Sequence, residues 1–304
     1  MGSNGKEKNN AAELNGHFNH LKIADATNDY GTADYVIFGV PFDNTSSYRR
    51  GSRLAPNSIR IAYDNLESYE VNYGIDFGEC NIADLGDLPA YEDVNYTISE
   101  VEDVTRLIFN DKKIPIMLGG EHSITIGAIR NLKDVDMVII DAHSDFRDSY
   151  FENKFNHACV TRRALEMLGR DKIISIGTRS TSREEIESEA YKNVRFVSAN
   201  EVRLKGIKNI INEIKSKFDK NIYFSIDMDG IDPAYAPGVG TPEPYGLLAN
   251  DVKEIINALA DKIIGFDIVE ITPLYDNGNT SMLAAKFIQD FIASRENILK
   301  NFKN

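Results

Sequence analysis

The chain has 304 residues, of which 42% are hydrophobic and 27% are charged, and its formal net charge at pH 7 is −13. This composition is typical of a soluble globular protein, and no apolar run approaches the ~20 residues that a membrane-spanning helix needs. The negative charge argues against nucleic acid or anionic lipid as a partner, because both bind basic surfaces. It suits a small cationic substrate, and solubility alone would also explain it.

Domain organisation and compartment follow from what the chain does not contain. No proline-rich or serine-rich linker and no internal repeat interrupts it, so we expect a disordered tail at residues 1–15 and a single domain at residues 16–304. Cys80 and Cys159 lie far apart without CxxC spacing, which argues against a disulfide framework and a structural zinc site. The N-terminus lacks the apolar segment of a secretory signal, so we expect a cytoplasmic protein.

Short β-branched runs alternate with longer amphipathic segments along the whole chain. This alternation predicts an α/β fold, in which helices flank a parallel sheet of about eight strands. The strands are expected at residues 35–40, 81–84, 114–118, 137–141, 173–176, 195–198, 222–227 and 263–269. Apolar residues on a helical period predict helices at residues 92–110, 251–260 and 281–299.

Metal-competent side chains follow several of these strands, at the carboxyl ends where parallel sheets bind ligands. His122 comes after residues 114–118 and two glycines; alone, it would more often cap or pack a helix than bind a ligand. Asp141, His143 and Asp145 occupy alternate positions after the next strand and point to one side if the backbone is extended. By themselves, these three residues are as consistent with an acidic, solvated loop as with a cation site.

Two later strands end in acidic residues. Asp227 and Asp229 follow residues 222–227, and carboxylates this close are costly unless they are protonated or bridged by cations. An EF-hand calcium loop fits poorly, because a strand precedes the pair and no helical Glu follows at the required spacing. Glu270 closes an apolar strand, so it faces either a site or an ion pair in the core or at an interface.

Together these side chains form a ligand set of imidazoles and carboxylates without thiolates, which suits Mn²⁺ better than a structural zinc site. The predicted metal ligands are His122, Asp141, His143, Asp145, Asp227 and Asp229. The four carboxylates would balance two divalent ions, and such a pair can lower the pKa of a shared water towards neutrality. The set therefore predicts metal-assisted hydrolysis.

The sequence around these residues resembles the ureohydrolase family, which comprises arginase, agmatinase and their relatives. The blocks that carry the resemblance extend over roughly residues 30–300 and are Gly39-Val40-Pro41-Phe42-Asp43, Gly119-Gly120-Glu121-His122-Ser123, Asp141-Ala142-His143-Ser144-Asp145, Ser225-Ile226-Asp227-Met228-Asp229-Gly230-Ile231-Asp232-Pro233, Pro237-Gly238-Val239-Gly240-Thr241-Pro242 and Asp267-Ile268-Val269-Glu270. The resemblance implies a three-layer α/β/α sandwich, two Mn²⁺ ions per chain, hydrolysis of a guanidinium group to release urea, and a homo-oligomer, either a trimer or a hexamer.

The resemblance also assigns roles within the site. The six predicted ligands match those of the family, and Asp145 additionally matches the carboxylate that hydrogen-bonds a metal-bridging hydroxide. Glu270 matches the acid that pairs with the guanidinium, His157 matches a proton shuttle, and Thr241 matches a residue near the guanidinium. These roles suit the chemistry, because a guanidinium is a poor electrophile that needs a strong nucleophile, an anchoring carboxylate and a proton for its leaving amine. Without the resemblance, an exposed loop residue remains the alternative interpretation of His157.

The predicted substrate rests on positions at which this sequence differs from the arginases. The residues that hold the amino-acid end of arginine are not evident in the loop 146–157, and Ser180 follows Arg179 where arginases have Asp. The segment around His157 is closer to agmatinases, although Ala158 replaces a glycine. The prediction is hydrolysis of agmatine to putrescine and urea, as in polyamine biosynthesis. The alternatives are arginase, guanidinobutyrase or another guanidino-acid hydrolase, with Arg147 or Arg162 binding the carboxylate, and a catalytically silent metal-binding assembly module.

Overall fold

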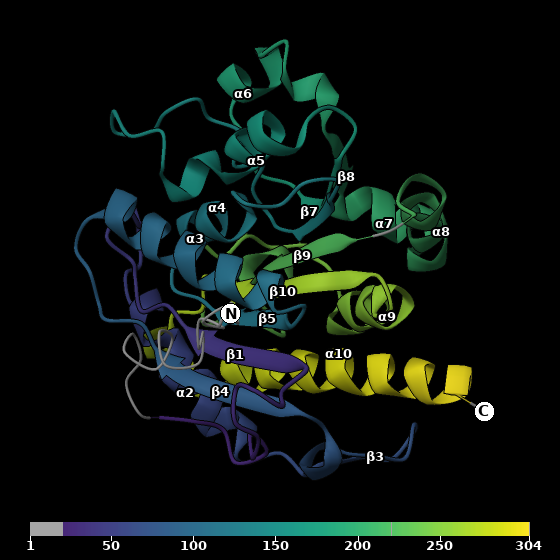
Figure 1. Cartoon of the computed structure of the whole chain (residues 1–304). Helices are drawn as coiled ribbons and strands as arrows, with labels where there is room; N and C mark the ends of the chain where they lie inside the picture. The colour runs from purple at the N-terminus through teal and green to yellow at the C-terminus, as the bar shows by residue number, and fades with distance from the viewer. Residues whose placement is uncertain (1–20, 220, 304) are drawn as a thin grey trace, which may run out of the picture.

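A central sheet of eight parallel strands lies between two layers of helices (Figure 1). The computed structural model describes residues 21–219 and 221–303, so the expected tail at residues 1–15 lies outside the described residues. The strands are β1 (Tyr35–Gly39), β4 (Ile82–Asp87), β5 (Ile114–Leu118), β6 (Asp136–Ile140), β7 (Ile173–Thr178), β8 (Arg195–Ser198), β9 (Ile222–Asp227) and β10 (Ile263–Val269). The predicted parallel sheet and the three-layer α/β/α sandwich are confirmed.

The order of the strands explains where a ligand site can form. Across the sheet the order is β4-β1-β5-β10-β9-β6-β7-β8, and every neighbouring pair is parallel. The consecutive strands β5 and β6 are separated by β10 and β9. From β6 the chain continues to β7 and β8 at one edge of the sheet, whereas from β9 it continues to β10 in the direction of the other edge. Open α/β sheets bind ligands in the crevice that such a reversal leaves at the carboxyl ends. The four strands whose ends carry the candidate residues are the four in the middle of the sheet.

Helices bury both faces of the sheet, which is why its strands are nearly continuous apolar runs. One face packs against α3 (Val94–Asn110), α4 (Thr125–Ile129) and α5 (Val160–Leu168). The other packs against α2 (Ala55–Tyr63), α7 (Ala199–Lys205), α8 (Ile207–Lys217), α9 (Ala249–Leu259) and α10 (Asn279–Lys303), the long yellow helix of Figure 1. Among the described residues, no helix has the length and apolar character required to cross a membrane.

The three predicted helices correspond to α3, α9 and α10, whereas α2, α5, α7 and α8 were not predicted. Helix α3 shows why its signal was clear: the carboxylate of Asp93 accepts the Tyr96 N–H at 2.8 Å and caps it, and apolar residues on one side are buried. The remaining elements are the helix α6 (Arg183–Glu187), the antiparallel pair β2 (Tyr69–Glu70) and β3 (Ile75–Asp76), and 3₁₀ turns at Ser52–Leu54, Phe77–Glu79, His122–Ile124, His157–Cys159, Tyr191–Asn193, Met228–Gly230 and Pro273–Tyr275.

A buried ion pair joins α2 to β4. The guanidinium of Arg60 donates from Nε to Asp84 Oδ2 at 2.8 Å and from Nη2 to Asp84 Oδ1 at 3.0 Å, and Nη1 pairs with Asp87. The Asp84 carboxylate also accepts the N–H groups of Ile23 and Gly86. The side chains of Arg60 and Asp84 are both fully buried, so each charge depends on the other for its solvation.

The turn after β5 brings an early segment of the chain against the site. A Cβ on Gly120 would lie 1.9 Å from the Phe42 carbonyl oxygen, so only glycine permits this approach. The N–H of the next residue, Glu121, donates to the same carbonyl at 2.8 Å. The segment that follows Phe42 is therefore held across the carboxyl end of β5.

Candidate metal centre and active-site pocket

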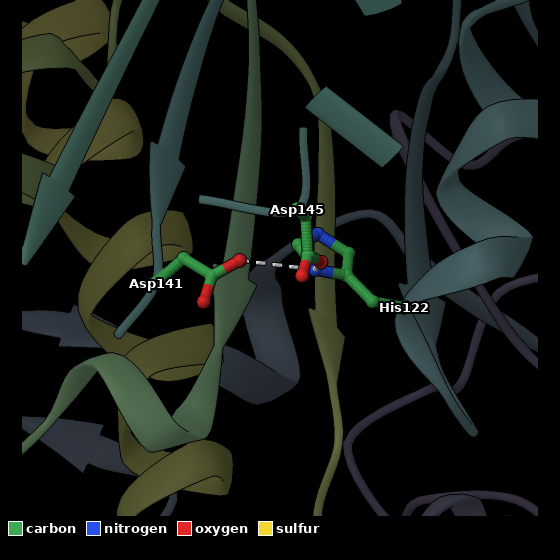
Figure 2. A group of neighbouring side chains, drawn as sticks. All are labelled: His122, Asp141 and Asp145. Atoms are coloured by element: carbon green, nitrogen blue, oxygen red, sulfur yellow. Dashed lines mark ion pairs between the residues drawn. The ribbon is translucent and has the colours of Figure 1, made fainter. Parts of the chain in front are cut away.

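Three carboxylates converge on one imidazole nitrogen at the carboxyl end of the sheet. Nδ1 of His122, in the turn after β5, lies 3.3 Å from Oδ2 of Asp141 and 3.2 Å from Oδ2 of Asp145. Figure 2 shows these two carboxylates facing the imidazole ring. Oδ2 of Asp227, at the end of β9, lies 3.4 Å from the same nitrogen.

A second group lies on the other side of Asp141. Nδ1 of His143 is 3.0 Å from Oδ2 of Asp229 and 3.8 Å from Oδ1 of Asp141. Asp141 therefore presents one oxygen to His122 and the other to His143. The triplets His122, Asp141, Asp145 and Asp141, His143, Asp229 each bring their ligand atoms close enough to hold one ion, and they share this aspartate.

The buried atoms of the centre fit divalent cations. Nδ1 of His122 and Oδ2 of Asp141 are buried and have no hydrogen-bond partner among the described residues. Buried polar atoms normally find a partner, and two that converge without one indicate an ion. Nitrogen and carboxylate donors without thiolates are a ligand set for a hard or borderline divalent metal.

The electrostatics of the protein alone show how strongly the carboxylates repel one another. Burial and the charge of Asp145 raise the pKa of Asp141 to about 7. Burial and the charges of Asp229 and Asp141 raise the pKa of Asp227 well above its ordinary range. Without cations, this cluster therefore holds protons at a pH where exposed carboxylates would be ionised. Divalent ions would replace those protons.

A hydrogen-bonded chain behind the centre fixes the ring of His122. Its Nε2 lies 3.1 Å from Oγ of Ser225, which donates to Oδ1 of Asp267 at 2.6 Å. The hydroxyls of Tyr223 and Thr125 donate to the other oxygen of Asp267. Because its Nε2 is held on this side, His122 directs Nδ1 into the centre.

The remaining predicted residues surround a pocket of about 170 Å³ above the centre. Glu270 and Thr241 form part of its wall; the Glu270 carboxylate accepts the His122 N–H at 2.8 Å, and Thr241 Oγ1 donates to Asp229 at 3.0 Å. His157 lines the wall, with its ring edge-on to that of Tyr150. The structure thus brings all nine predicted site residues together: seven line the pocket, and His122 and Asp141 lie fully buried beside it.

Two of these residues have backbones in the left-handed region, with φ of 47° at Asp145 and 65° at Glu270. This conformation is uncommon for residues other than glycine and tends to be retained where function requires a particular side-chain direction. Asp145 lies in the loop after β6, and Glu270 is the first residue after β10. Both carboxylates lie in the pocket wall as a result.

The two arginines considered for a substrate carboxylate differ in position. Arg147 lines the pocket, with its guanidinium 5.1 Å from the ring centre of Tyr150. Arg162 instead pairs through Nε with Glu166 at 3.0 Å and lies over the ring of Phe146. Arg147 is therefore the one of the two that a bound substrate could meet.

Sequence reasoning missed several residues that organise the site. Glu121 is buried and accepts hydrogen bonds from Thr45 and Ser46, which belong to the segment held at Gly120. Arg179 donates to six backbone carbonyls and so links the end of β7 to the segments 229–231 and 243–244; the carbonyls belong to Gly177, Asp229, Gly230, Ile231, Glu243 and Pro244. Glu121 stood within a block that carried the family resemblance, but nothing in the sequence indicated its partners.

Comparisons with known proteins agree with this geometry. The model of the Arginase family matches residues 33–293. An agmatinase of Pyrococcus horikoshii is 40% identical over 268 residues, which are 86% of this chain and 92% of that protein. The N(1)-aminopropylagmatine ureohydrolase of Thermococcus kodakarensis is 38% identical over 261 residues, which are 84% of this chain and 88% of that protein.

A solved structure gives the same result for the fold. The agmatine ureohydrolase of Thermoplasma volcanium superposes with a TM-score of 0.91 at 61% identity, and the match covers 95% of this chain and 99% of that chain. The resemblance to ureohydrolases is therefore confirmed, and the chain belongs to the arginase family, whose members are hydrolases that act on guanidino groups.

Proposed function

We propose that this protein hydrolyses agmatine to putrescine and urea and that it holds two Mn²⁺ ions per chain. The observation that carries the proposal is the pair of ligand triplets that share Asp141, beneath a pocket that also contains Glu270 and His157. The names of the similar proteins support the substrate, since one is an agmatinase and another an agmatine ureohydrolase.

The residues that would hold the ions are His122, Asp141, Asp145, Asp227, His143 and Asp229. When bound, such ions act as Lewis acids and generate a nucleophile from water near neutral pH. Manganese suits the set because four of its six side chains supply hard oxygen donors and the other two supply imidazole nitrogens. Binding to a metal ion would give Nδ1 of His122 and Oδ2 of Asp141 the partner that they lack among the described residues.

The chain's own residues position the substrate and move protons. The carboxylate of Glu270 would pair with the guanidinium, because a planar guanidinium donates well to a buried carboxylate. Asp145 would accept a hydrogen bond from the attacking water. Thr241, whose hydroxyl donates to Asp229, would lie beside the guanidinium. His157 would deliver a proton to the leaving amine.

The tail of the substrate would extend towards a second cavity of about 210 Å³, which shares His143, Asp145 and Arg147 with the first. Its other walls include the hydroxyl residues Ser180, Thr181 and Ser182. Hydroxyl oxygens can accept hydrogen bonds from the terminal ammonium of agmatine. Position 180 is a serine, whereas arginases have an Asp there that binds the amino-acid end of arginine.

Arg147 favours a second candidate within the same family, a hydrolase of guanidino acids. A cation in the pocket wall would attract the carboxylate of 4-guanidinobutyrate, whereas it would repel the ammonium of agmatine. Its pairing with Glu184, at 3.7 Å, offsets part of that charge. Agmatine therefore remains the proposed substrate.

Urea release from agmatine, arginine and 4-guanidinobutyrate by the manganese-loaded protein tests the proposal. We expect turnover of agmatine to exceed that of the two acids. Turnover confined to arginine would overturn the proposed substrate, and preference for 4-guanidinobutyrate that disappears in Arg147→Gln would establish the second candidate. Fewer than two ions per chain without hydrolysis of any guanidine would instead indicate a silent assembly module.

We also propose that the protein is a cytoplasmic homo-oligomer, a trimer or a hexamer. Cys80 and Cys159 are both buried free thiols, which suits a reducing compartment. Light scattering coupled to size-exclusion chromatography measures the oligomeric state directly, and a monomer at micromolar concentration would contradict it.

A further inference from the structure

We propose that Glu121 and Thr45 form a positioning pair that fixes the tautomer of His157, with the proton on Nδ1 and the free lone pair of Nε2 facing the pocket. The three side chains come from distant parts of the chain: the segment after β1, the turn after β5 and the loop before α5. The inference rests on the proposed function for its catalytic consequence, although the tautomer itself can be measured without a substrate.

The first step is the hydrogen-bond inventory of Glu121. Its side chain is fully buried, and its oxygens accept the N–H groups of Thr45 at 2.7 Å and Ser46 at 3.0 Å. They also accept the hydroxyls of Ser123, at 2.6 Å, and Thr45. Every group that hydrogen-bonds to Glu121 is therefore a donor, and a carboxylate whose hydrogen bonds all come from donors acts only as an acceptor.

The second step concerns the hydroxyl of Thr45. A hydroxyl has a single proton to donate, and here Thr45 gives it to Glu121. Its oxygen can then only accept from its remaining neighbours. Those are the backbone N–H of His157 at 3.2 Å and the imidazole Nδ1 of His157 at 3.1 Å. The contact with Nδ1 is satisfied only if Nδ1 carries a proton.

The third step follows for the other ring nitrogen. A neutral imidazole carries one proton, so with Nδ1 protonated the Nε2 atom has a free lone pair. Nε2 has no hydrogen-bond partner in the described part of the chain, while His157 lines the pocket. The ring is also held edge-on to Tyr150, with 5.9 Å between the ring centres. Because Thr45 occupies Nδ1, Nε2 is the ring nitrogen that remains available to a bound substrate.

This arrangement prepares His157 for proton transfer. Nε2 accepts the proton that the attacking water loses, the ring becomes a cation, and Nδ1–H continues to donate to Thr45 without any rearrangement. Nε2 then gives that proton to the nitrogen of the leaving amine as the bond from that nitrogen to the guanidinium carbon breaks, and the ring returns to its starting tautomer. With the opposite tautomer, Nε2 would already carry its proton and could not accept another.

The variants that test the pair are Thr45→Val, which removes the hydroxyl but keeps the shape, and Thr45→Ser, which restores the hydroxyl. The matched control is Thr105→Val, because the buried hydroxyl of Thr105 donates to backbone carbonyls within α3, those of Val101 and Glu102, rather than to Glu121 or His157. Circular dichroism and thermal melting of each variant establish that the fold is retained.

The direct readout is the pattern of imidazole ¹⁵N chemical shifts in the full chain loaded with diamagnetic Zn²⁺. The chain has 5 histidines, so His157 can be assigned with a His157→Gln sample. We expect wild type, Thr45→Ser and Thr105→Val to show the Nδ1–H tautomer of His157, and Thr45→Val to show a mixture of tautomers. An Nε2–H tautomer in the wild type, or an unchanged tautomer in Thr45→Val, would overturn the inference even if no guanidine were hydrolysed.

The kinetic readout uses the manganese-loaded enzyme and agmatine. We expect kcat of Thr45→Val to fall about 10- to 100-fold, within the range that general acid–base catalysis contributes. KM should remain within about twofold, because His157 acts on the leaving amine rather than in binding. Thr45→Ser should recover most of kcat. Wild-type kcat in Thr45→Val would overturn the positioning role, whereas absence of agmatine turnover in the wild type would count against the proposed function alone.

Discussion

Nδ1 of His122 lies 3.2 Å from Oδ2 of Asp145, although these residues follow strands β5 and β6, which are not neighbours in the sheet. Strands β10 and β9 lie between them, so the loops after β5 and β6 must both reach over the middle of the sheet. Oδ2 of Asp227, at the end of β9, lies 3.4 Å from the same nitrogen. The metal centre therefore depends on the loop that carries Asp145 and not only on the strand ends.

Asp145→Asn is expected to weaken metal binding and abolish urea release while leaving the fold intact. The amide cannot supply the negative charge that helps hold a divalent ion. Asparagine tolerates a positive φ, so the backbone at 47° is not strained by the change. Metal content by mass spectrometry, circular dichroism and urea release together measure the three effects.

The matched control is Asp134→Asn, since Asp134 is exposed and also has a positive φ, of 54°. It should retain both ions and full activity. Retained activity in Asp145→Asn would mean that Asp145 is not a ligand, and loss of metal in Asp134→Asn would mean that the substitution acts through the backbone.

The stability of the metal-free protein should fall as the pH rises. Burial and Asp145 raise the pKa of Asp141 from 3.8 to about 7, so between these values the folded protein binds a proton that the unfolded chain has lost. Burial disfavours the cation of His143, but the charge of Asp229 outweighs this effect and raises its pKa to about 11. Folding therefore takes up protons, and a pH increase opposes folding.

Bound ions replace those protons, so they should stabilise the protein more at higher pH. We expect the difference in Tm between manganese-loaded and chelator-treated protein to grow from about pH 5 to about pH 8. Calorimetry at matched ionic strength measures it. A difference that stays constant or shrinks over this range would show that the carboxylates do not exchange protons for metal.

Glu270→Gln is expected to lower kcat/KM for agmatine about 10- to 100-fold, because a hydrogen bond to a charged group contributes about 1.5–3 kcal/mol. The amide oxygen can still accept the His122 N–H, so the metal centre should keep its ions. Initial rates of urea release and metal content are the measurements. Glu296→Gln serves as the control, since its carboxylate accepts the Tyr35 hydroxyl away from the pocket.

An unchanged kcat/KM in Glu270→Gln would remove this residue from guanidinium binding. Loss of metal together with activity would instead assign Glu270 to the metal centre. The two results are distinguishable because metal content is measured on the same samples.

Arg60→Met is expected to destabilise the protein by about 3–5 kcal/mol, because it leaves the buried carboxylate of Asp84 without its counter-charge. Chemical denaturation followed by circular dichroism measures the free energy of unfolding. Arg106→Met provides the comparison: Arg106 pairs with Asp103 on the surface, where such pairs contribute about 0–1 kcal/mol. Equal effects of the two substitutions would show that burial does not govern the contribution of the Arg60 pair.

The sequence predicted the sheet well because its strands are buried on both faces and leave a strong apolar signal. The strands at residues 114–118, 195–198, 222–227 and 263–269 were predicted with the bounds that the structure has. Helix α7 was missed because its 7 residues give too short a periodic pattern. Helix α8 was also missed, although with 11 residues it is as long as the predicted α9 and is likewise buried on one side. The order of the strands depends on which distant segments pair, and no local pattern contains that information.

The same distinction holds for the site. Asp141, His143 and Asp145 could be grouped because they occupy alternate positions after one strand, but only their combination with His122, Asp227 and Asp229 favoured a cation site over an acidic loop. No role could be assigned to Glu121, because its role depends on hydrogen bonds from Thr45, which the fold brings from a distant segment. Arg147 and Arg162 looked equivalent in the sequence, and only packing separates them.

The division between the buried ligands and the loops around them has a consequence for protein engineering. The ends of β5, β6, β9 and β10 carry most of the predicted site residues, whereas residues 46–49, 147–158 and 180–182 supply most of the outer walls. A library restricted to those three loops, with His157 left unchanged, would alter which guanidine the proposed enzyme accepts while the predicted metal ligands stay in place. Directed evolution towards longer or branched guanidines should begin there.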